Sequence, residues 1–197
     1  MYKLLFFIIF PILISACSIP ETKIYDLHLD DSEKIKNIPY RKTDASIAVH
    51  VKAPSYLSQP YIVTRTSPYQ IQISKTAKWE SPPKRFIRQG LKDILSGLSY
   101  FEHVSLSQTQ PEGYYWLAVD LKRFELVDKE EGFWGELCMD VSLFDHEMNR
   151  LFMSTIAKKK QLGTKDFRNL AHVLSTFLTE GLEEIKVDVM QYVQNQH

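Results

Sequence analysis

Two cysteines and six histidines are the side chains of this 197-residue chain best suited to covalent or metal chemistry. The histidines stand at positions 28, 50, 103, 146, 172 and 197, and they show no metal-ligand spacing. The sequence also contains no GxSxG or HExxH motif and no glycine-rich loop that would cradle a phosphate. These patterns predict no catalytic residue, metal or cofactor. They leave the thiol of Cys17 as the one group whose surroundings indicate a reaction.

The first seventeen residues resemble a lipoprotein export signal. Lys3 precedes an apolar run from Leu4 to Ile14, which is shorter than the roughly 20 apolar residues that span a bilayer. The run ends in Ile14-Ser15-Ala16-Cys17, which is similar to a lipobox. We therefore expect residues 1–16 to be a cleaved signal peptide and the sulfur of Cys17 to carry lipid. The alternative is an ordinary secretory signal followed by an incidental cysteine.

Lipidation would decide where the protein works. Each buried methylene contributes about 0.8 kcal/mol, so two or three acyl chains on one residue give lasting attachment to a membrane. Residues 17–22 are then the lipidated cysteine and a short tether. Ser18 follows the lipidated position, where an Asp would resemble the inner-membrane retention signal of Gram-negative bacteria. By that resemblance we expect the periplasmic leaflet of the outer membrane.

Composition limits the net charge, the number of domains and the disulfides that the rest of the chain can have. The signal takes away only Lys3 of the charged residues, so a formal charge of zero becomes −1. This near balance gives no basic surface for nucleic acid. Residues 23–197 are enough for one compact domain and too few for two ordinary ones. With Cys17 lipidated, Cys138 has no partner for an internal disulfide, and its alternating surroundings predict a half-buried strand thiol.

Hydrophobic residues at every second position predict most of the domain to be strands. The charged segment Asp30–Asp44 has no clear period and is expected to be loop. The expected strands are Lys23–Leu29, Ser46–Lys52, Tyr61–Arg65, Tyr69–Ser74, Phe101–Leu106, Tyr114–Val127, Glu136–Phe144 and Leu151–Leu162. The third and fourth should form a hairpin, and the last three an antiparallel meander. The apolar face changes parity near Lys122 or Arg123, which predicts a β-bulge there.

Two stretches change to the helical period. The first begins at Pro82 with Ser81 as the expected N-cap, and its apolar stripe runs from Ile87 to Leu98. The second runs from Lys165 to about Tyr192, with Thr164 as its expected N-cap. The sequence thus predicts an α+β fold: a single domain with a mixed, mostly antiparallel sheet covered by two amphipathic helices.

Local patterns across the mature chain resemble one family. Ile24-Tyr25-Asp26-Leu27 is similar to the first strand of the ABC-type transport auxiliary lipoproteins, the paraquat-inducible protein C group. The segment from Pro54 to Arg65 matches that family's P-x-Y-L-x-x-P-x-I-V-x-R signature. Ser67-Pro68-Tyr69 and Lys78-Trp79-Glu80 continue the match in order.

This resemblance implies a non-catalytic lipoprotein that works with an MCE-domain (mammalian cell entry) system moving lipids between two membranes. It brings no catalytic residues to this chain. The sequence departs from the family at two places. The spacer Asp30–Asp44 is long, and Lys78 stands where an Arg is more familiar, which leaves the need for a planar guanidinium there open.

The signature segment also concentrates residue types that are enriched at protein interfaces. The candidate partner or self-assembly surface consists of Pro54, Tyr56, Tyr61, Arg65, Tyr69 and Trp79. It would contact either the tip of an MCE-domain partner or further copies of this chain in a ring. The alternative for Trp79 and the tyrosines is packing of the hairpin against the first helix.

Two other functions compete with docking. A lipid-anchored hydrolase would need a nucleophile, a base and an orienting group in reach of one another, and no motif marks such a set. A periplasmic chaperone that holds lipid in its own apolar cavity is the stronger alternative. Lipid that co-purifies with the domain would favour the chaperone.

Overall fold

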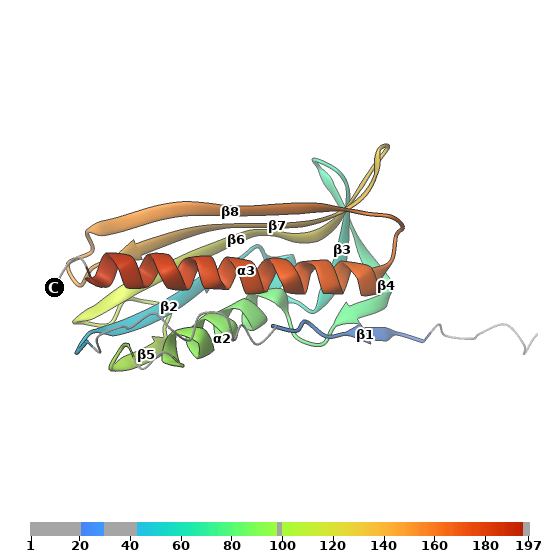
Figure 1. The fold of residues 1–197 in the computed structure, drawn as a ribbon. Helices are drawn as coiled ribbons and strands as arrows, with labels where there is room; N and C mark the ends of the chain where they lie inside the picture. The colour runs from blue at the N-terminus through green and yellow to red at the C-terminus, as the bar shows by residue number, and fades with distance from the viewer. Residues whose placement is uncertain (1–20, 30–42, 98–99, 195–197) are drawn as a thin grey trace, which may run out of the picture.

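The computed structural model describes residues 21–29, 43–97 and 100–194. One eight-stranded sheet and two α-helices form this part of the chain (Figure 1). The elements in chain order are β1 (Lys23–Tyr25), β2 (Ser46–Lys52), the 3-10 turn η3 (Ser55–Ser58), β3 (Tyr61–Ser67), β4 (Gln70–Trp79), α2 (Pro83–Ser96), β5 (His103–Leu106), β6 (Tyr114–Lys129), β7 (Gly132–Phe144), β8 (Arg150–Leu162) and α3 (Phe167–Gln194). The predicted single-domain α+β fold is confirmed. The expected signal peptide 1–16, the residue Cys17 and most of the expected loop 30–44 lie outside the described residues.

The sheet is organised around β6. One edge of β6 pairs antiparallel with β7 along its length, and β7 pairs antiparallel with β8, which confirms the meander. The other edge pairs in parallel first with β2 and then, further along, with β3. Most paired residues are antiparallel, yet the β1–β4, β2–β5, β2–β6 and β3–β6 ladders are parallel. Hydrophobic alternation shows which face of a strand is buried, but it does not reveal the direction of its neighbour.

The predicted bulge is present on β6. The register with β7 shifts between Leu121 and Arg123, so Lys122 is the extra residue. Leu121 before the shift and Phe124 after it are both fully buried, because the bulge restores the apolar face. The same point separates the part of β6 that pairs with β2 from the part that pairs with β3.

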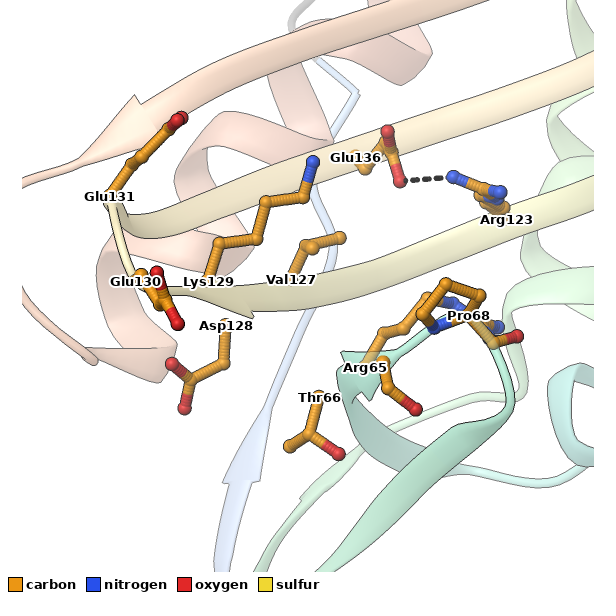
Figure 2. Close-up of a pocket in the computed structure, with 11 residues that line it drawn as sticks. Arg65, Thr66, Pro68, Arg123, Val127, Asp128, Lys129, Glu130, Glu131 and Glu136 are labelled. Atoms are coloured by element: carbon orange, nitrogen blue, oxygen red, sulfur yellow. Dashed lines mark hydrogen bonds and ion pairs between the residues drawn. The ribbon is translucent and has the colours of Figure 1, made fainter.

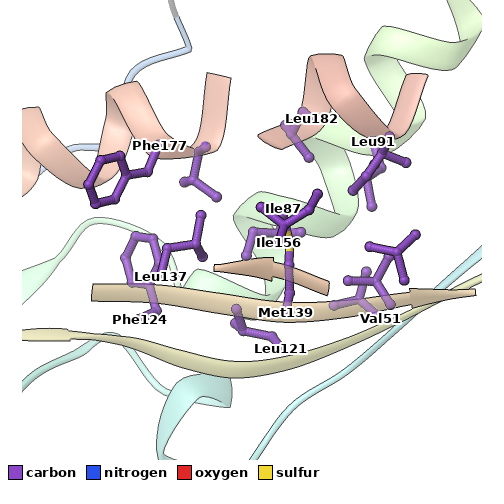
Figure 3. Close-up of a cluster of buried hydrophobic side chains, with 14 of the residues drawn as sticks. Val51, Ile87, Leu91, Leu121, Phe124, Leu137, Met139, Ile156, Phe177 and Leu182 are labelled. Carbon is purple, nitrogen blue, oxygen red and sulfur yellow. The ribbon is translucent and has the colours of Figure 1, made fainter. Parts of the chain in front are cut away.

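The two helices cover one face of the sheet. Helix α3 packs on β7 and β8, helix α2 packs on β2 and β5, and the helices touch each other. Figure 3 shows the resulting core, with Phe177 and Leu182 of the helix facing Leu137, Met139 and Ile156 of the strands. The covering role predicted for both helices is confirmed.

Gly90 of α2 lets the two helices approach each other closely. A Cβ built on Gly90 would lie 2.9 Å from Cδ1 of Leu182 and 3.1 Å from Cδ1 of Leu29. The absence of a side chain at Gly90 therefore allows α2 to pack against α3, which offsets the cost of about 1 kcal/mol for glycine inside a helix.

Both predicted N-caps are wrong. Helix α2 begins at Pro83, one residue late, and Pro82 occupies the cap position with φ −54° and ψ 136°. A residue before proline is pushed out of the helical region, so Pro83 prevents Pro82 from being the first helical residue. Helix α3 begins at Phe167, and the carboxylate of Asp166 accepts hydrogen bonds from the backbone N–H groups of Arg168 (3.0 Å) and Asn169 (3.3 Å). Asp166 is therefore the cap, in place of Thr164.

Several strands differ from the prediction in length. β1 ends at Tyr25, four residues early, and β5 begins at His103, two residues late. β3 and β4 are longer than expected, and β4 reaches Trp79 because it also pairs with β1. β7 begins at Gly132, so the connection to β6 is a tight turn at Glu130 and Glu131.

Candidate docking cleft

Two hairpin ends project side by side from one end of the molecule and diverge (Figure 1). One is the turn between β3 and β4, and the other is the turn between β6 and β7. The space between them is a cleft of about 490 Å³. It is lined by Arg65, Thr66, Ser67, Pro68, Arg123, Val127, Asp128, Lys129, Glu130, Glu131 and Glu136 (Figure 2). We call this space the hairpin cleft.

Strand register explains why the cleft exists. β3 and β6 are in register only at Thr64 with Leu126 and at Arg65 with Val127. Beyond these pairs each strand continues into its own hairpin, β3 with β4 and β6 with β7. The two strand ends therefore separate, and the side chains of Thr66 and Asp128 lie on opposite walls (Figure 2).

A buried ion pair lies at the base of the cleft. Nε and Nη2 of Arg65 donate to Oε1 and Oε2 of Glu125 at 2.5 and 3.1 Å. The side chain of Glu125 is fully buried, whereas that of Arg65 is 18% exposed. The hydrogen bond to Glu125 raises the pKa of Arg65 above its ordinary value. Two parallel bonds of this kind fix the guanidinium in one orientation.

Tyr56 completes this group. Its hydroxyl donates to Oε2 of Glu125 and accepts from Nη2 of Arg65, each at 3.5 Å. Burial raises the pKa of Tyr56, and the nearby charge of Glu125 raises it further. Tyr56 is therefore a neutral residue whose hydroxyl links the η3 turn to the Arg65–Glu125 ion pair.

A second ion pair stiffens the wall formed by β6 and β7. Nη1 of Arg123 lies 2.8 Å from Oε2 of Glu136, as the dashed line in Figure 2 shows. The hydrogen bond to Glu136 raises the pKa of Arg123. Each arginine of the cleft is thus neutralised by a glutamate. The turn carries Asp128, Glu130 and Glu131 together with Lys129, and Asp128 is paired with Lys165 at 3.4 Å, so Glu130 and Glu131 make its tip slightly acidic.

The residues of the predicted surface do not form one patch. Tyr56 and Arg65 meet at the base of the cleft, and Tyr69 stands at the tip of the β3–β4 hairpin with 99% of its surface exposed. Tyr61 is 39% exposed, but it pairs with Lys78 at the far end of the hairpin. Pro54 is half-buried beside η3, where its carbonyl accepts from Leu57 N–H.

Trp79 lies in the core of the chain. It is 1% exposed, and its ring packs edge-on against Phe124 with centroids 5.6 Å apart. This placement agrees with the packing alternative for Trp79, and we leave it out of the surface proposed below.

Sequence reasoning missed the acidic half of the site. Glu125 stands between the apolar residues Phe124 and Leu126 just after the parity change, and a charge inside such a stretch was the available signal. Its partner Arg65 is 60 positions away, and periodicity within each strand does not reveal that pairing.

The described residues contain no candidate metal site, and their free cysteine, Cys138, is not activated as a nucleophile. Within the described ranges, no group of three or more His, Cys, Asp or Glu residues is placed to hold a metal ion. Cys138 is half-buried on β7, as predicted. Burial raises the pKa of its thiol, with the charge of Asp140 adding to the rise, so little reactive thiolate forms at neutral pH. None of the helices described is long and apolar enough to cross a membrane.

The fold and the cleft define a small α+β domain with a charged surface groove. The chain belongs to the family described as ABC-type transport auxiliary lipoprotein component, whose profile matches residues 25–186. This match confirms the resemblance drawn from the signature segment. The family description indicates an accessory role in transport.

Solved structures support the same fold. A Xanthomonas campestris protein of domain-of-unknown-function family 330 is similar at 16% identity and a TM-score of 0.69, with 88% of this chain and 98% of that chain covered. An uncharacterised protein is similar at 18% identity and a TM-score of 0.64, covering 86% of this chain and 99% of that one. No curated protein matches the sequence.

Proposed function

We propose that this chain is a lipid-anchored accessory subunit that docks the end of an MCE-domain transport conduit at the periplasmic face of the outer membrane. Membership of the auxiliary lipoprotein family supports the accessory role. The observation that carries the docking role is the hairpin cleft, a charged groove between two projecting hairpins whose base is fixed by the Arg65–Glu125 ion pair.

The position of the cleft is consistent with a membrane-proximal partner. β1, where the described chain begins, and the two hairpin ends lie at the same end of the elongated molecule, opposite the C-terminus (Figure 1). Six residue steps separate Cys17 from Lys23 and span at most about 21 Å. A lipid on Cys17 would therefore hold this end of the domain near the membrane, where a conduit that crosses the periplasm would terminate.

Tyr69 is the contact residue best suited to a test. It is exposed at the hairpin tip, so its removal should leave the fold unchanged. Buried aromatic anchors dominate many interfaces, with losses of about 2 kcal/mol or more on truncation. In a detergent extract of cells that contain both proteins, Tyr69→Ala should capture far less MCE-domain partner than the unmodified chain.

Met153→Ala is the matched control, because Met153 is an apolar side chain that is 58% exposed on β8, away from the cleft. Circular dichroism should show the same fold for both variants. Equal capture of the partner by the Tyr69 variant and the control would reject the docking role of the hairpin cleft. Loss of capture together with a smaller particle mass would instead place the Tyr69 contact between copies of this chain in a ring.

The structure also bears on the lipid-chaperone alternative. The hairpin cleft is lined mainly by charged and hydroxyl side chains, which suit a protein surface better than an acyl chain. We therefore keep docking as the proposed function.

A further inference from the structure

A second groove lies along the N-terminal segment. It has a volume of about 390 Å³ and runs between β1 with the residues after it and the first turns of α3. Its lining residues are Ile24, Tyr25, Asp26, His28, Arg168, Ala171, His172, Ser175 and Thr176. We call it the N-terminal groove.

The walls of this groove are held in place by contacts on both sides. The ring of Tyr25 packs edge-on against Phe167 with centroids 6.2 Å apart. Further along, the backbone N–H of His28 donates to Oγ of Ser175 at 3.0 Å, and Leu27 between them is buried. The segment is thus fixed on the helix, and the groove is preformed.

Two opposite charges share the groove without neutralising each other. Within the described part of the chain, neither the carboxylate of Asp26 nor the guanidinium of Arg168 takes part in an ion pair, although both side chains are exposed. His28 and His172 add ring nitrogens that can donate to an anion, and the Ser175 hydroxyl, which accepts from His28, keeps its own hydrogen to donate. The arrangement offers an anion site and a cation site in one groove.

We propose that the N-terminal groove binds the zwitterionic phosphoethanolamine headgroup of a phospholipid in the membrane that holds the protein. Arg168, with His28 and His172, meets the phosphate, and Asp26 meets the ammonium. Guanidinium and phosphate form the stronger, charge-assisted kind of hydrogen bond. Ile24 is 61% exposed beside these charges and contacts the apolar part of the lipid below the headgroup.

The choice of a membrane lipid comes from the position of the groove. Ile24 lies seven residues after Cys17, so an anchored chain holds the groove within about 25 Å of the lipidated sulfur. This inference rests on the proposed function, because the lipid anchor on Cys17 is what brings the groove to membrane phospholipid. The chemistry of the groove itself is independent of that anchor.

Nuclear magnetic resonance of the full mature chain tests the proposal, with the ring signals of His28 and His172 as reporters. Glycerophosphoethanolamine is the soluble probe, and inorganic phosphate and glycerophosphocholine are the comparison ligands. Both histidine signals should shift and saturate with glycerophosphoethanolamine, and Arg168→Glu should weaken this binding about tenfold or more, as expected for one charge-assisted hydrogen bond. Asp26→Asn should reduce the preference for glycerophosphoethanolamine over inorganic phosphate.

Arg85→Glu is the matched control, because Arg85 is an exposed arginine on α2 outside the groove. Equal weakening by this control, or no saturable shift in the unmodified chain, would overturn the proposal. Equal affinity for inorganic phosphate would show a free-phosphate site and would also overturn it. Saturable binding in a chain that is found unattached to membranes would uphold the groove chemistry while the proposed anchor fails.

Discussion

Arg65 and Glu125 are the residues on which the hairpin cleft depends. The Glu125 side chain is fully buried and its only described cationic partner is Arg65, so removing the arginine leaves a buried charge unpaired. Breaking such a pair from one side typically costs about 3–5 kcal/mol. We expect Arg65→Met to lower the free energy of unfolding by an amount near that range, measured by urea denaturation.

The double variant Arg65→Met with Glu125→Leu separates charge from packing. Replacing both partners of a buried pair by apolar residues is often neutral or stabilising. The double variant should therefore recover most of the stability lost by the single one. A double variant as unstable as the single variant would show that the pair is not the source of the effect.

Asp145 provides a pH-dependent test in the turn between β7 and β8. Burial acts to raise the pKa of Asp145, but hydrogen bonds from the side chain and backbone of Asn149 and from the backbone of Glu147 outweigh it and lower the pKa overall. A lowered folded-state pKa gives stability that is present above the unfolded value near 3.9 and is lost as pH falls through the folded value.

Asp145→Ala should accordingly be less stable than the unmodified chain at pH 7, and the difference in melting temperature should shrink on going to pH 3. An unchanged difference at the two pH values would contradict the contribution of the charged carboxylate.

For single residues, the sequence identified side chains of the kind found at interfaces, but it did not reveal where the fold places each of them. Tyr69 and Arg65 were singled out as interface-type residues in the signature; Arg65 lines the hairpin cleft, and Tyr69 is exposed at the tip of the β3–β4 hairpin. Trp79 was singled out by the same reasoning but is buried, because residue type does not tell which face of a strand is covered. Glu125 was missed because its partner comes from another strand.

The elements were predicted more fully, with errors concentrated at their ends. The bulge at Lys122 was visible as a change of parity, because burial on one face imposes a strict period of two. Helix starts were harder to predict, since two possible capping residues, Thr164 and Asp166, stand close together before α3. The order of the strands in the sheet was not predictable. The first part of β6 pairs with β2 and the last part with β3, and these strands are far from β6 in the sequence.

The cap of α3 can be tested directly. Asp166 accepts from two backbone N–H groups at the helix start, so Asp166→Ala should lower the free energy of unfolding by about 1 kcal/mol, within the usual range for a lost N-cap. Thr164→Ala is the control and should have little effect. The reverse order in thermal or urea unfolding would restore Thr164 as the cap.

The whole molecule is an elongated domain with its working features gathered at one end. The 28 residues of α3 span about 42 Å, and the hairpin cleft and the N-terminal groove both lie away from its C-terminal end. In the proposed account, this end faces the membrane and meets the conduit, and the long helix and sheet give it a rigid support.

Ser18 should decide which membrane carries the protein. In a Gram-negative host, the unmodified chain should fractionate with the outer membrane, whereas Ser18→Asp should move it to the inner membrane. Thr22→Asp places the same charge further along the tether and should leave the location unchanged. Inner-membrane location of the unmodified chain would contradict the proposed site of action.

Mass spectrometry of the amino-terminal peptide of the native protein tests the central claim most directly. The account predicts that the polypeptide begins at Cys17 and that this residue carries the added mass of a diacylglyceryl group and an amide-linked fatty acid. A native chain that keeps residues 1–16, or that begins at Cys17 with no added lipid, would contradict the account.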